Sequence, residues 1–223
     1  RLSVTVVPEV SSTNTVLAEQ AQNGAADGTV LAAHCQTAGR GRMGRSFLSP
    51  KGGLYFSVLL RPPFSLARSN ILTPSAAVSM AKALESTCGI APRIKWVNDL
   101  YLNERKICGI LTEAMPDKSG AGFDYVIIGI GVNLYPAAQA LPAELAQKVG
   151  TVFTAATDID YRPQILAAFL DNFFALYPAL PHEELYNSYK ERLFILNREA
   201  LITQGSEIYQ AQVLDLNEDF SLR

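Results

Sequence analysis

A glycine- and arginine-rich stretch, residues 39–45, is the part of the sequence best suited to chemistry on anions. It reads Gly-Arg-Gly-Arg-Met-Gly-Arg. Glycine lets the backbone approach a ligand closely, and arginine presents planar donor forks that fit carboxylate and phosphate oxygens. A site that joins a carboxylate to a nucleotide needs such cations. A solvated basic turn or a nucleic-acid contact is the plainer alternative, and no Gly-Lys-Ser/Thr follows to make a Walker A loop.

Three further stretches place polar residues beside predicted strands. Lys95–Leu100, which reads Lys-Trp-Val-Asn-Asp-Leu, lies where a strand ends and a hairpin begins, and such positions commonly line sites. Lys106 starts an apolar strand in which Gly109 permits close approach of a ligand or of backbone. Gly129–Asn133 ends another strand with Gly-x-Gly and an amide. Taken singly, each also fits a structural role: turn chemistry, a lysine directed to solvent, or a bulge with an Asn cap.

Alternating strands and helices would position these residues. Apolar runs predict strands at 4–7, 29–33, 54–60, 93–97 and 125–132, with a hairpin over 100–114. Capping and periodic patterns predict helices from Ser12–Asn14 to Gly24, from Thr73-Pro74 to Gly89, from Pro163 to Tyr177, and over Glu183–Leu193. The run 125–132 is apolar on both faces, which places it at the sheet centre. This order predicts an α+β fold with a mixed central sheet flanked by helices.

Composition limits the class of protein. The chain has 223 residues, of which 48% are hydrophobic and 18% charged, so it can bury one sizeable core plus a small appended piece. The net charge of −2 gives no sequence-independent grip on nucleic acid. No apolar run reaches the ~18 residues needed to span a bilayer, so no membrane partner is expected. Three separated cysteines predict free thiols in a reducing, cytoplasmic compartment.

Taken together, in their order and spacing, these segments resemble the biotin protein ligases. The resemblance rests on Ser12–Asn14, Gln36 with Gly39–Arg45, Lys95–Leu100, Lys106–Leu111 and Gly129–Asn133. It implies a sheet related to class II aminoacyl-tRNA synthetases, followed by an SH3-like C-terminal domain. It also implies synthesis of biotinyl-5′-AMP from biotin and Mg-ATP, then transfer to one lysine of an apo biotin carboxyl carrier domain, as in acetyl-CoA carboxylase.

This resemblance divides the chain into two parts. Residues 1–196 are expected to form the biotin- and ATP-binding catalytic domain. Residues 197–223 have short alternating apolar stretches and end just after a turn-like Asn217-Glu218-Asp219. They are expected to be the beginning of the SH3-like domain, a strand pair cut off before the domain closes.

The resemblance further implies roles for individual residues. The implied biotin contacts are Ser12, Thr13, Asn14, Gln36, Gly39, Arg40, Gly41, Arg42, Lys106 and Gly109. The implied ATP and adenylate contacts are Arg42, Arg45, Trp96, Asn98, Lys106 and Asn133. Arg42, Arg45 and Lys106 are expected to act in catalysis on the phosphate. Asp99 is expected either to bind or deprotonate the incoming lysine or to hold Mg²⁺.

Two residues depart from the family pattern. Val97 stands where the family usually has proline, and Cys108 stands where glycine or alanine is common. A reactive Cys108 beside the acyl site would make the enzyme sensitive to thiol reagents.

Other functions and partners stay open at this stage. A lipoate or octanoate ligase on the same scaffold is one alternative. A fragment of a biotin-sensing repressor is another, and DNA becomes a partner only if a winged-helix domain precedes Arg1. A free sheet edge would allow carrier docking or a homodimer.

Overall fold

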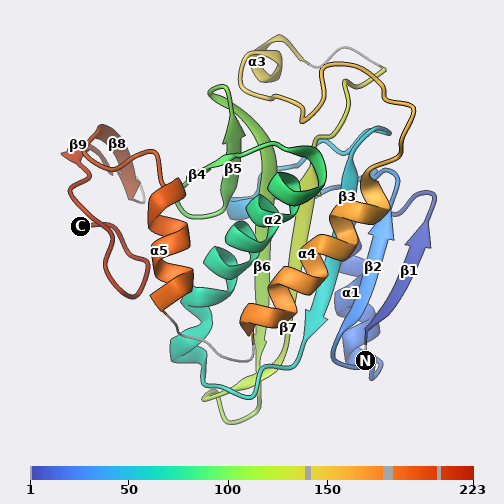
Figure 1. Ribbon diagram of the computed structural model, residues 1–223. Helices are drawn as coiled ribbons and strands as arrows, with labels where there is room; N and C mark the ends of the chain where they lie inside the picture. The colour runs from blue at the N-terminus through green and yellow to red at the C-terminus, as the bar shows by residue number, and fades with distance from the viewer. Residues whose placement is uncertain (1, 139–141, 178–182, 205–206) are drawn as a thin grey trace.

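A seven-stranded mixed sheet forms the centre of the protein in the computed structural model, which describes all residues except 1, 139–141, 178–182 and 205–206 (Figure 1). The strand order is β1-β2-β3-β7-β6-β5-β4. β1 pairs with β2 in parallel, and the other neighbours are antiparallel. The strands are β1 (Ser3–Val7), β2 (Thr29–Ala33), β3 (Leu54–Leu60), β4 (Arg93–Lys95), β5 (Asp99–Leu102), β6 (Arg105–Pro116) and β7 (Phe123–Val132).

The predicted central strand, β7, lies in the middle of the sheet between β3 and β6. Its last eight residues are all buried. Because helices cover both faces of this strand, alternate residues on each side are apolar, and the run shows no polar face. The prediction for residues 125–132 is therefore confirmed.

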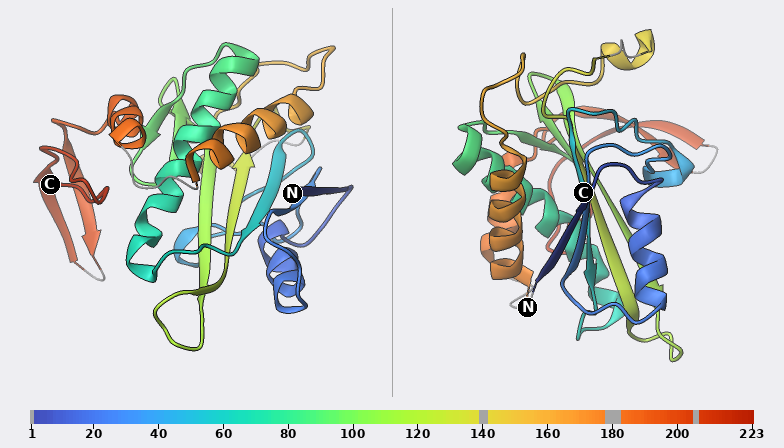
Figure 2. Two further views of the ribbon diagram at one scale, coloured as in Figure 1. Left: turned by 60° about the horizontal axis from the view of Figure 1, so that its bottom comes forward. Right: turned by 90° about the vertical axis from the view of Figure 1, so that its right-hand side faces the viewer.

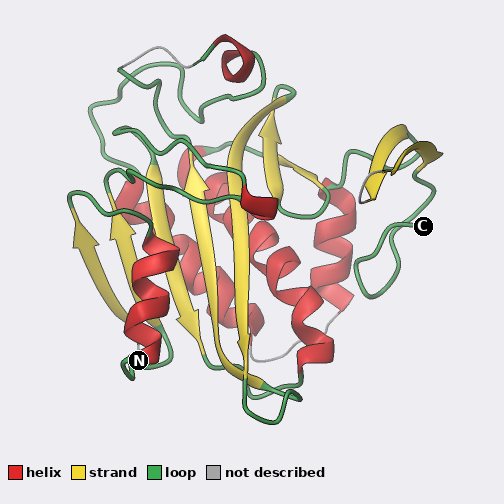
Figure 3. Cartoon of the chain, turned by 180° about the vertical axis from the view of Figure 1, so that it is seen from behind, coloured by secondary structure: helices red, strands yellow, loops and turns green. Residues whose placement is uncertain are grey.

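Helices lie on both faces of the sheet (Figures 2 and 3). α1 (Thr13–Gln22) covers one face, where Leu17 packs with Ile127 and neighbouring residues. α2 (Leu72–Cys88) and α4 (Arg162–Leu176) cover the other face and enclose the larger hydrophobic core. Successive strand residues point to opposite faces, so the same strands supply both cores.

The hairpin between β5 and β6 forms as predicted. Its turn residues Asn103 and Glu104 have φ of 48° and 62°. Positive φ at both central residues gives the turn whose twist matches the flanking strands. The hairpin brings Asp99 opposite Gly109, three residues beyond Lys106.

Several predicted boundaries differ from the structure by one or two residues, and two of these differences have a clear cause. α2 begins at Leu72 because a 3-10 helix over Leu66–Ile71 runs directly into it, so Thr73 lies inside the helix and does not cap it. β4 ends at Lys95, and the predicted strand residues 96–97 belong to the loop before β5. Because Trp96 lies in this loop, it is not part of the strand pairing between β4 and β5.

The C-terminal part consists of a helix and a separate small sheet. α5 (Glu183–Arg192) packs beside α2, and β8 (Glu199–Gln204) pairs antiparallel with β9 (Glu207–Gln212). The predicted strand pair is therefore confirmed, while residues 205–206 between the strands lie outside the described residues. The assignment of 1–196 and 197–223 to two domains stays a prediction.

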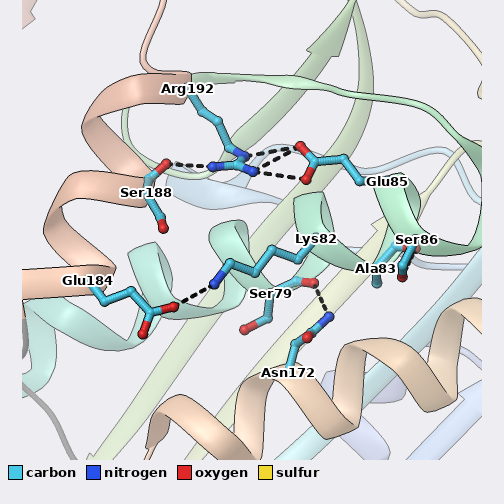
Figure 4. A network of polar contacts seen from close by, with 9 residues as sticks. All are labelled: Ser79, Lys82, Ala83, Glu85, Ser86, Asn172, Glu184, Ser188 and Arg192. Atoms are coloured by element: carbon cyan, nitrogen blue, oxygen red, sulfur yellow. Dashed lines mark hydrogen bonds and ion pairs between the residues drawn. The ribbon is translucent and has the colours of Figure 1, made fainter.

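Polar contacts fasten α5 to α2 (Figure 4). Arg192 Nη2 lies 2.9 Å from both carboxylate oxygens of Glu85, and Lys82 Nζ lies 2.9 Å from Glu184 Oε1. The Glu85 pair is forked, which gives it a defined geometry.

One short helix, α3 (Ala143–Ala146), lies in the connection from β7 to α4. In the described part of the chain, no helix has both the length and the apolar character needed to cross a membrane.

Candidate active site

The floor of the candidate site is formed by glycines on the α1 face of β6 and β7. Gly109 pairs with Gly131, and Gly129 lies two residues away on β7, where it pairs with Leu111. A Cβ on Gly131 would lie 2.5 Å from the Phe47 ring, and one on Gly129 would overlap the Asn14 side-chain oxygen. Only hydrogen fits at these positions, so the glycines allow Phe47 and Asn14 to lie directly on the sheet.

Residues lining this central cavity come from α1, from the Gly-Arg loop and from the sheet. They are Ser12, Thr13, Asn14, Gln36, Arg40, Gly41, Arg42, Phe47, Asn98, Lys106, Gly109, Ile110, Leu111, Gly129, Ile130 and Gly131. Nine of the ten implied biotin contacts thus meet in one cavity, although they are up to 97 positions apart in sequence. The tenth, Gly39, is buried beside the cavity, where a Cβ would overlap the Phe47 carbonyl oxygen.

One end of the central cavity is a buried polar network. The Thr13 amide donates to Gln36 Oε1 at 2.8 Å, and Gln36 Nε2 donates to Ser49 Oγ at 2.8 Å. Ser57 Oγ donates to Asn14 Oδ1 at 2.6 Å and lies 2.7 Å from Thr13 Oγ1. The network fixes these side chains before any ligand binds, which lowers the entropic cost of binding.

The start of α1 explains why its polar residues face the cavity. Ser12 caps the helix, accepting from the Thr15 amide at 3.5 Å. Ser12, Thr13 and Asn14 are 2–4% exposed, although they are polar. Because α1 begins beside the cavity, its cap residue and the residues of its first turn face the site.

The other end of the central cavity is charged. Lys106 Nζ lies 2.7 Å from Asp99 Oδ1, and Arg42 Nη1 donates to Asn98 Oδ1 at 3.1 Å. At the end with the polar network, Arg40 Nη2 lies 2.8 Å from Glu113 Oε1, and the same carboxylate accepts from Asn14. The loop cations are thus held by partners from the sheet and from the β4–β5 loop.

The Gly-Arg loop crosses the α1 face of the sheet, where its short helical turn, Arg42–Gly44, is visible in Figure 3. Met43 and Gly44 have φ of 57° and 72°. The Gly41 amide donates to the Arg45 carbonyl at 2.7 Å and closes the turn. Arg45 itself is exposed and lies outside the central cavity.

A second cavity, the aromatic cavity, adjoins the first through Lys106 and Phe47. It is lined by Ser46, Phe47, Leu48, Pro50, Lys51, Gly53, Tyr55, Lys106, Asn133, Tyr135, Leu145, Val149 and Thr151. Flat aromatic and apolar walls with one amide suit a heteroaromatic ring.

A third cavity, the C-terminal cavity, adjoins the first through Arg42 and Ile110. It is lined by Arg42, Asn70, Thr73, Trp96, Val97, Ile110, Thr112, Asp219, Phe220 and Ser221. Trp96 and Asn133, which the resemblance assigns together to the adenylate, therefore line different cavities. The Trp96 indole N–H donates to the Phe220 carbonyl at 2.7 Å, an interaction with a residue 124 positions away.

The sequence interpretation missed several residues of the site. Ser57 is a fully buried serine inside an apolar strand, and Glu113 accepts from both Arg40 and Asn14. A polar residue within an apolar strand was the signal for Ser57, since such a group needs a partner. Phe47 carries no sequence signal, because a single aromatic residue after a loop is most often core.

The expected reactivity of Cys108 is wrong in this structure. Cys108 points to the face opposite Gly109, is fully buried and belongs to the larger core. Burial raises the pKa of its thiol far above the ordinary range, and the nearby Lys106 lowers it only partly. The thiol is therefore an inert core group.

Residues 6–133, more than half of the chain, match the family model described as Biotin/lipoate A/B protein ligase family. The chain belongs to this family. It is 42% identical over 137 residues to the bifunctional ligase/repressor BirA of Bacillus spizizenii, matching 61% of this chain and 42% of that relative. It is 43% identical over 107 residues to the biotin–[acetyl-CoA-carboxylase] ligase of Paracoccus denitrificans, matching 47% of this chain and 44% of that one.

The likeness to solved structures extends over nearly the whole chain. The biotin protein ligase from Aquifex aeolicus in complex with biotin and ATP superimposes with a TM-score of 0.79 at 29% identity, covering 99% of this chain and 90% of that chain. The predicted fold class is thereby confirmed. The chain spans less than half the length of the curated relatives described above.

Proposed function

We propose that this chain is a biotin protein ligase that makes biotinyl-5′-AMP from biotin and ATP and transfers biotin to a lysine of a biotin carboxyl carrier domain. The observation that carries the proposal is the central cavity. It joins a preformed polar network at Thr13, Asn14 and Gln36 to the cations Arg42 and Lys106. A ligand with a hydrogen-bonding ring at one end and a carboxylate at the other fits both ends.

The first step needs no nucleophile from the protein. A carboxylic acid with a pKa of about 4 to 5 is ionised at neutral pH and can attack the α-phosphorus of ATP, releasing pyrophosphate. Arg42 and Lys106 line the charged end of the cavity, where both anions must meet. Removing one such donor typically lowers the rate ~10²–10³-fold. Arg45, which is exposed in the loop, is assigned to the outer phosphates.

The adenine ring is assigned to the aromatic cavity. Asn133 offers an amide there, and Tyr55 and Tyr135 offer ring faces. Lys106 lines this cavity and the central one, which is the placement needed for a group between acyl and nucleotide.

Magnesium is assigned to the substrate, as Mg-ATP. Among the described residues, no group of three or more metal-ligating side chains occurs. Asp99 is the carboxylate at the charged end, and Lys106 already pairs with it. Mg²⁺ is usually bound through one or two carboxylates and substrate phosphates, so these residues fit an ion that arrives on the nucleotide.

The deciding experiment incubates the protein with biotin and MgATP and follows pyrophosphate release and biotinyl-5′-AMP by mass spectrometry. Adding an apo biotin carboxyl carrier domain should then give a biotinylated lysine. Lipoate and octanoate serve as competing acids. Preference for one of these would replace the proposal with the alternative acyl ligase. Tight biotin binding without adenylate would favour a sensor.

We propose that the protein acts in the cytoplasm. The three cysteines Cys35, Cys88 and Cys108 are free thiols, as a reducing compartment would keep them. β1 is the candidate edge for pairing with a second copy or with the carrier domain. It is an outer strand of the sheet, and its five residues are largely exposed. Sedimentation with and without biotin would measure the oligomeric state.

A further inference from the structure

The proposed placement of biotin in the central cavity and of adenine in the aromatic cavity leaves the C-terminal cavity unassigned. Its volume is about 410 Å³, and it meets the central cavity at Arg42 and Ile110. Besides Arg42 of the Gly-Arg loop and two residues of β6, its walls come from residues around the start of α2, from the loop before β5, and from the C-terminal turn, residues 217–221. A cavity that reaches the reacting groups from outside can admit the second substrate.

Hydrogen bonds and aromatic contacts hold the C-terminal turn in place as one wall of the C-terminal cavity. Asn70 Nδ2 donates to the Asp219 carbonyl at 2.7 Å, and the Trp96 indole donates to the Phe220 carbonyl at 2.7 Å. The Phe220 ring is 4% exposed and packs edge-on against Tyr189 at 5.4 Å and Tyr186 at 6.1 Å. The turn is therefore part of the folded site.

The C-terminal cavity has a negative charge on the C-terminal turn and a positive charge where it meets the central cavity. The exposed Asp219 carboxylate lies on the C-terminal turn, and hydrogen bonds from Ser221 lower its pKa, so it is ionised at neutral pH. Arg42 lies at the end shared with the central cavity. The hydroxyls of Thr73 and Thr112, which are 2.8 Å apart, and the half-exposed Trp96 ring line the same cavity.

This arrangement fits a long alkylammonium group better than a polyphosphate. Asp219 attracts an ammonium group and repels phosphate, and the Trp96 face suits an alkyl chain or a cation. Arg42 at the inner end disfavours the ammonium form and so favours the neutral amine that must attack. Building on the proposed ligase function, we propose that the acceptor lysine reaches the acyl-adenylate through the C-terminal cavity.

The transfer step balances with the groups present. The lysine ammonium loses one proton to solvent as it passes from Asp219 toward Arg42. The nitrogen lone pair attacks the acyl carbon, the bond from that carbon to the phosphate oxygen breaks, and AMP leaves with the bonding electrons. The second nitrogen proton passes to the departing phosphate, and an amide remains.

The test supplies synthetic biotinyl-5′-AMP to the whole chain, so it measures transfer even if adenylate is not made from ATP. Nα-acetyl-lysine methylamide is the cationic acceptor, and hydroxylamine is an uncharged one. Asp219→Lys should raise the KM for the lysine amide about five- to tenfold and leave the hydroxylamine rate within twofold, since one reversed surface charge acts mainly on charged partners. Asp219→Asn should shift KM in the same direction by less.

Glu218→Lys is the matched control, because it makes the same charge change on the neighbouring exposed residue outside the cavity. It should leave the KM for the lysine amide unchanged. Equal effects of Asp219→Lys and Glu218→Lys would overturn the proposal. An Asp219→Lys variant that keeps the wild-type KM for the amide but binds pyrophosphate more tightly would also overturn it and assign the cavity to pyrophosphate. Failure to form adenylate from biotin and ATP would count against the ligase function alone.

Discussion

Single residues set the shape of the central cavity, and the glycines of β6 and β7 do so by lacking a side chain. Asn14 and Phe47 occupy the space where Cβ atoms of Gly129 and Gly131 would lie. Asn14 is also bound by Ser57 and Glu113, so it cannot move aside without breaking buried hydrogen bonds. A methyl group on this floor therefore disturbs binding groups directly.

Gly129→Ala should displace Asn14 and weaken biotin binding about tenfold or more, because overpacking and a lost buried hydrogen bond each cost about 1–3 kcal/mol. Titration calorimetry with biotin measures the affinity, and urea unfolding measures the stability. Removing the clashing atom with Asn14→Ala in the same chain should restore stability but not affinity. Unchanged affinity in Gly129→Ala would show that Asn14 does not contact the ligand.

The ion pair between Asp99 and Lys106 indicates that Asp99 acts by positioning Lys106. Its carboxylate holds Lys106 at 2.7 Å, so Asp99→Asn should leave Lys106 unanchored and slow adenylate formation roughly 10–100-fold. Transfer from supplied biotinyl-5′-AMP should fall less. Glu104→Gln, on the exposed turn of the same hairpin, is the control. A defect confined to transfer would assign Asp99 as the base for the incoming lysine.

Cys108 should resist alkylation in the folded protein. Burial raises the pKa of its thiol, so little thiolate exists at neutral pH, and no reagent reaches the sulfur. Iodoacetamide labelling followed by mass spectrometry should modify the half-buried Cys88 first and Cys108 only in guanidinium. Above the ordinary thiol pKa of about 8.5 the unfolded chain ionises while the folded one does not, so stability falls as pH rises. Rapid native labelling of Cys108 would contradict this.

At the scale of elements, α5 joins the core mainly through its contacts with α2. Leu185 and Tyr189 are buried on its inner side, while two ion pairs flank them. The pairs differ in exposure: the Arg192 and Glu85 side chains are 19% and 34% exposed, whereas Glu184 is 67% exposed. A partly buried, forked pair contributes more than an exposed one.

Glu85→Gln should therefore lower the free energy of unfolding by about 1–2 kcal/mol, whereas Lys82→Gln should change it by less than about 0.5 kcal/mol. Urea denaturation at low and high salt measures both. Salt should reduce the Lys82 effect more than the Glu85 effect. Equal losses in the two variants would mean that exposure does not separate the pairs.

At the scale of the whole molecule, the last residues of the chain return to the site. Phe220 packs between tyrosines of α5, and its carbonyl accepts from Trp96, two residues before Asn98. Tyr189 also donates to the Val97 carbonyl at 3.1 Å. The loop that presents Asn98 to Arg42 is thus supported from behind by the C-terminal turn and by α5.

Phe220→Ala should release the C-terminal turn, at a cost of up to about 3–5 kcal/mol for a buried phenylalanine. Trp96 is the chain's single tryptophan, so its fluorescence reports this change directly. Its emission should shift to longer wavelength before global unfolding in urea. Leu214→Ala, at a residue 55% exposed, should leave the emission unchanged. A single transition identical to wild type would show that the turn is not docked through Phe220.

Local patterns in the sequence were sufficient for most elements, and the family resemblance named residues that the structure brings together in one cavity. Period-two and period-3.6 apolar spacing depends on neighbours in the chain, so the strands, α1, α4 and the central place of β7 could be predicted. The Gly-Arg loop and Lys106 were recognisable because their residue types are unusual beside apolar strands. Nine predicted biotin contacts indeed share one cavity.

Register, face and long-range docking were decided only by the tertiary structure. Successive residues of β6 point to opposite faces of the sheet, so Cys108 lies in the core and Gly109 in the site. The register of the β5–β6 hairpin brings the Asp99 carboxylate to Lys106. Trp96 lies with Phe220 instead of Asn133 because a contact across 124 positions leaves no local pattern. Such contacts depend on how faces pack after the elements have formed, which is why spacing along the chain could not reveal them.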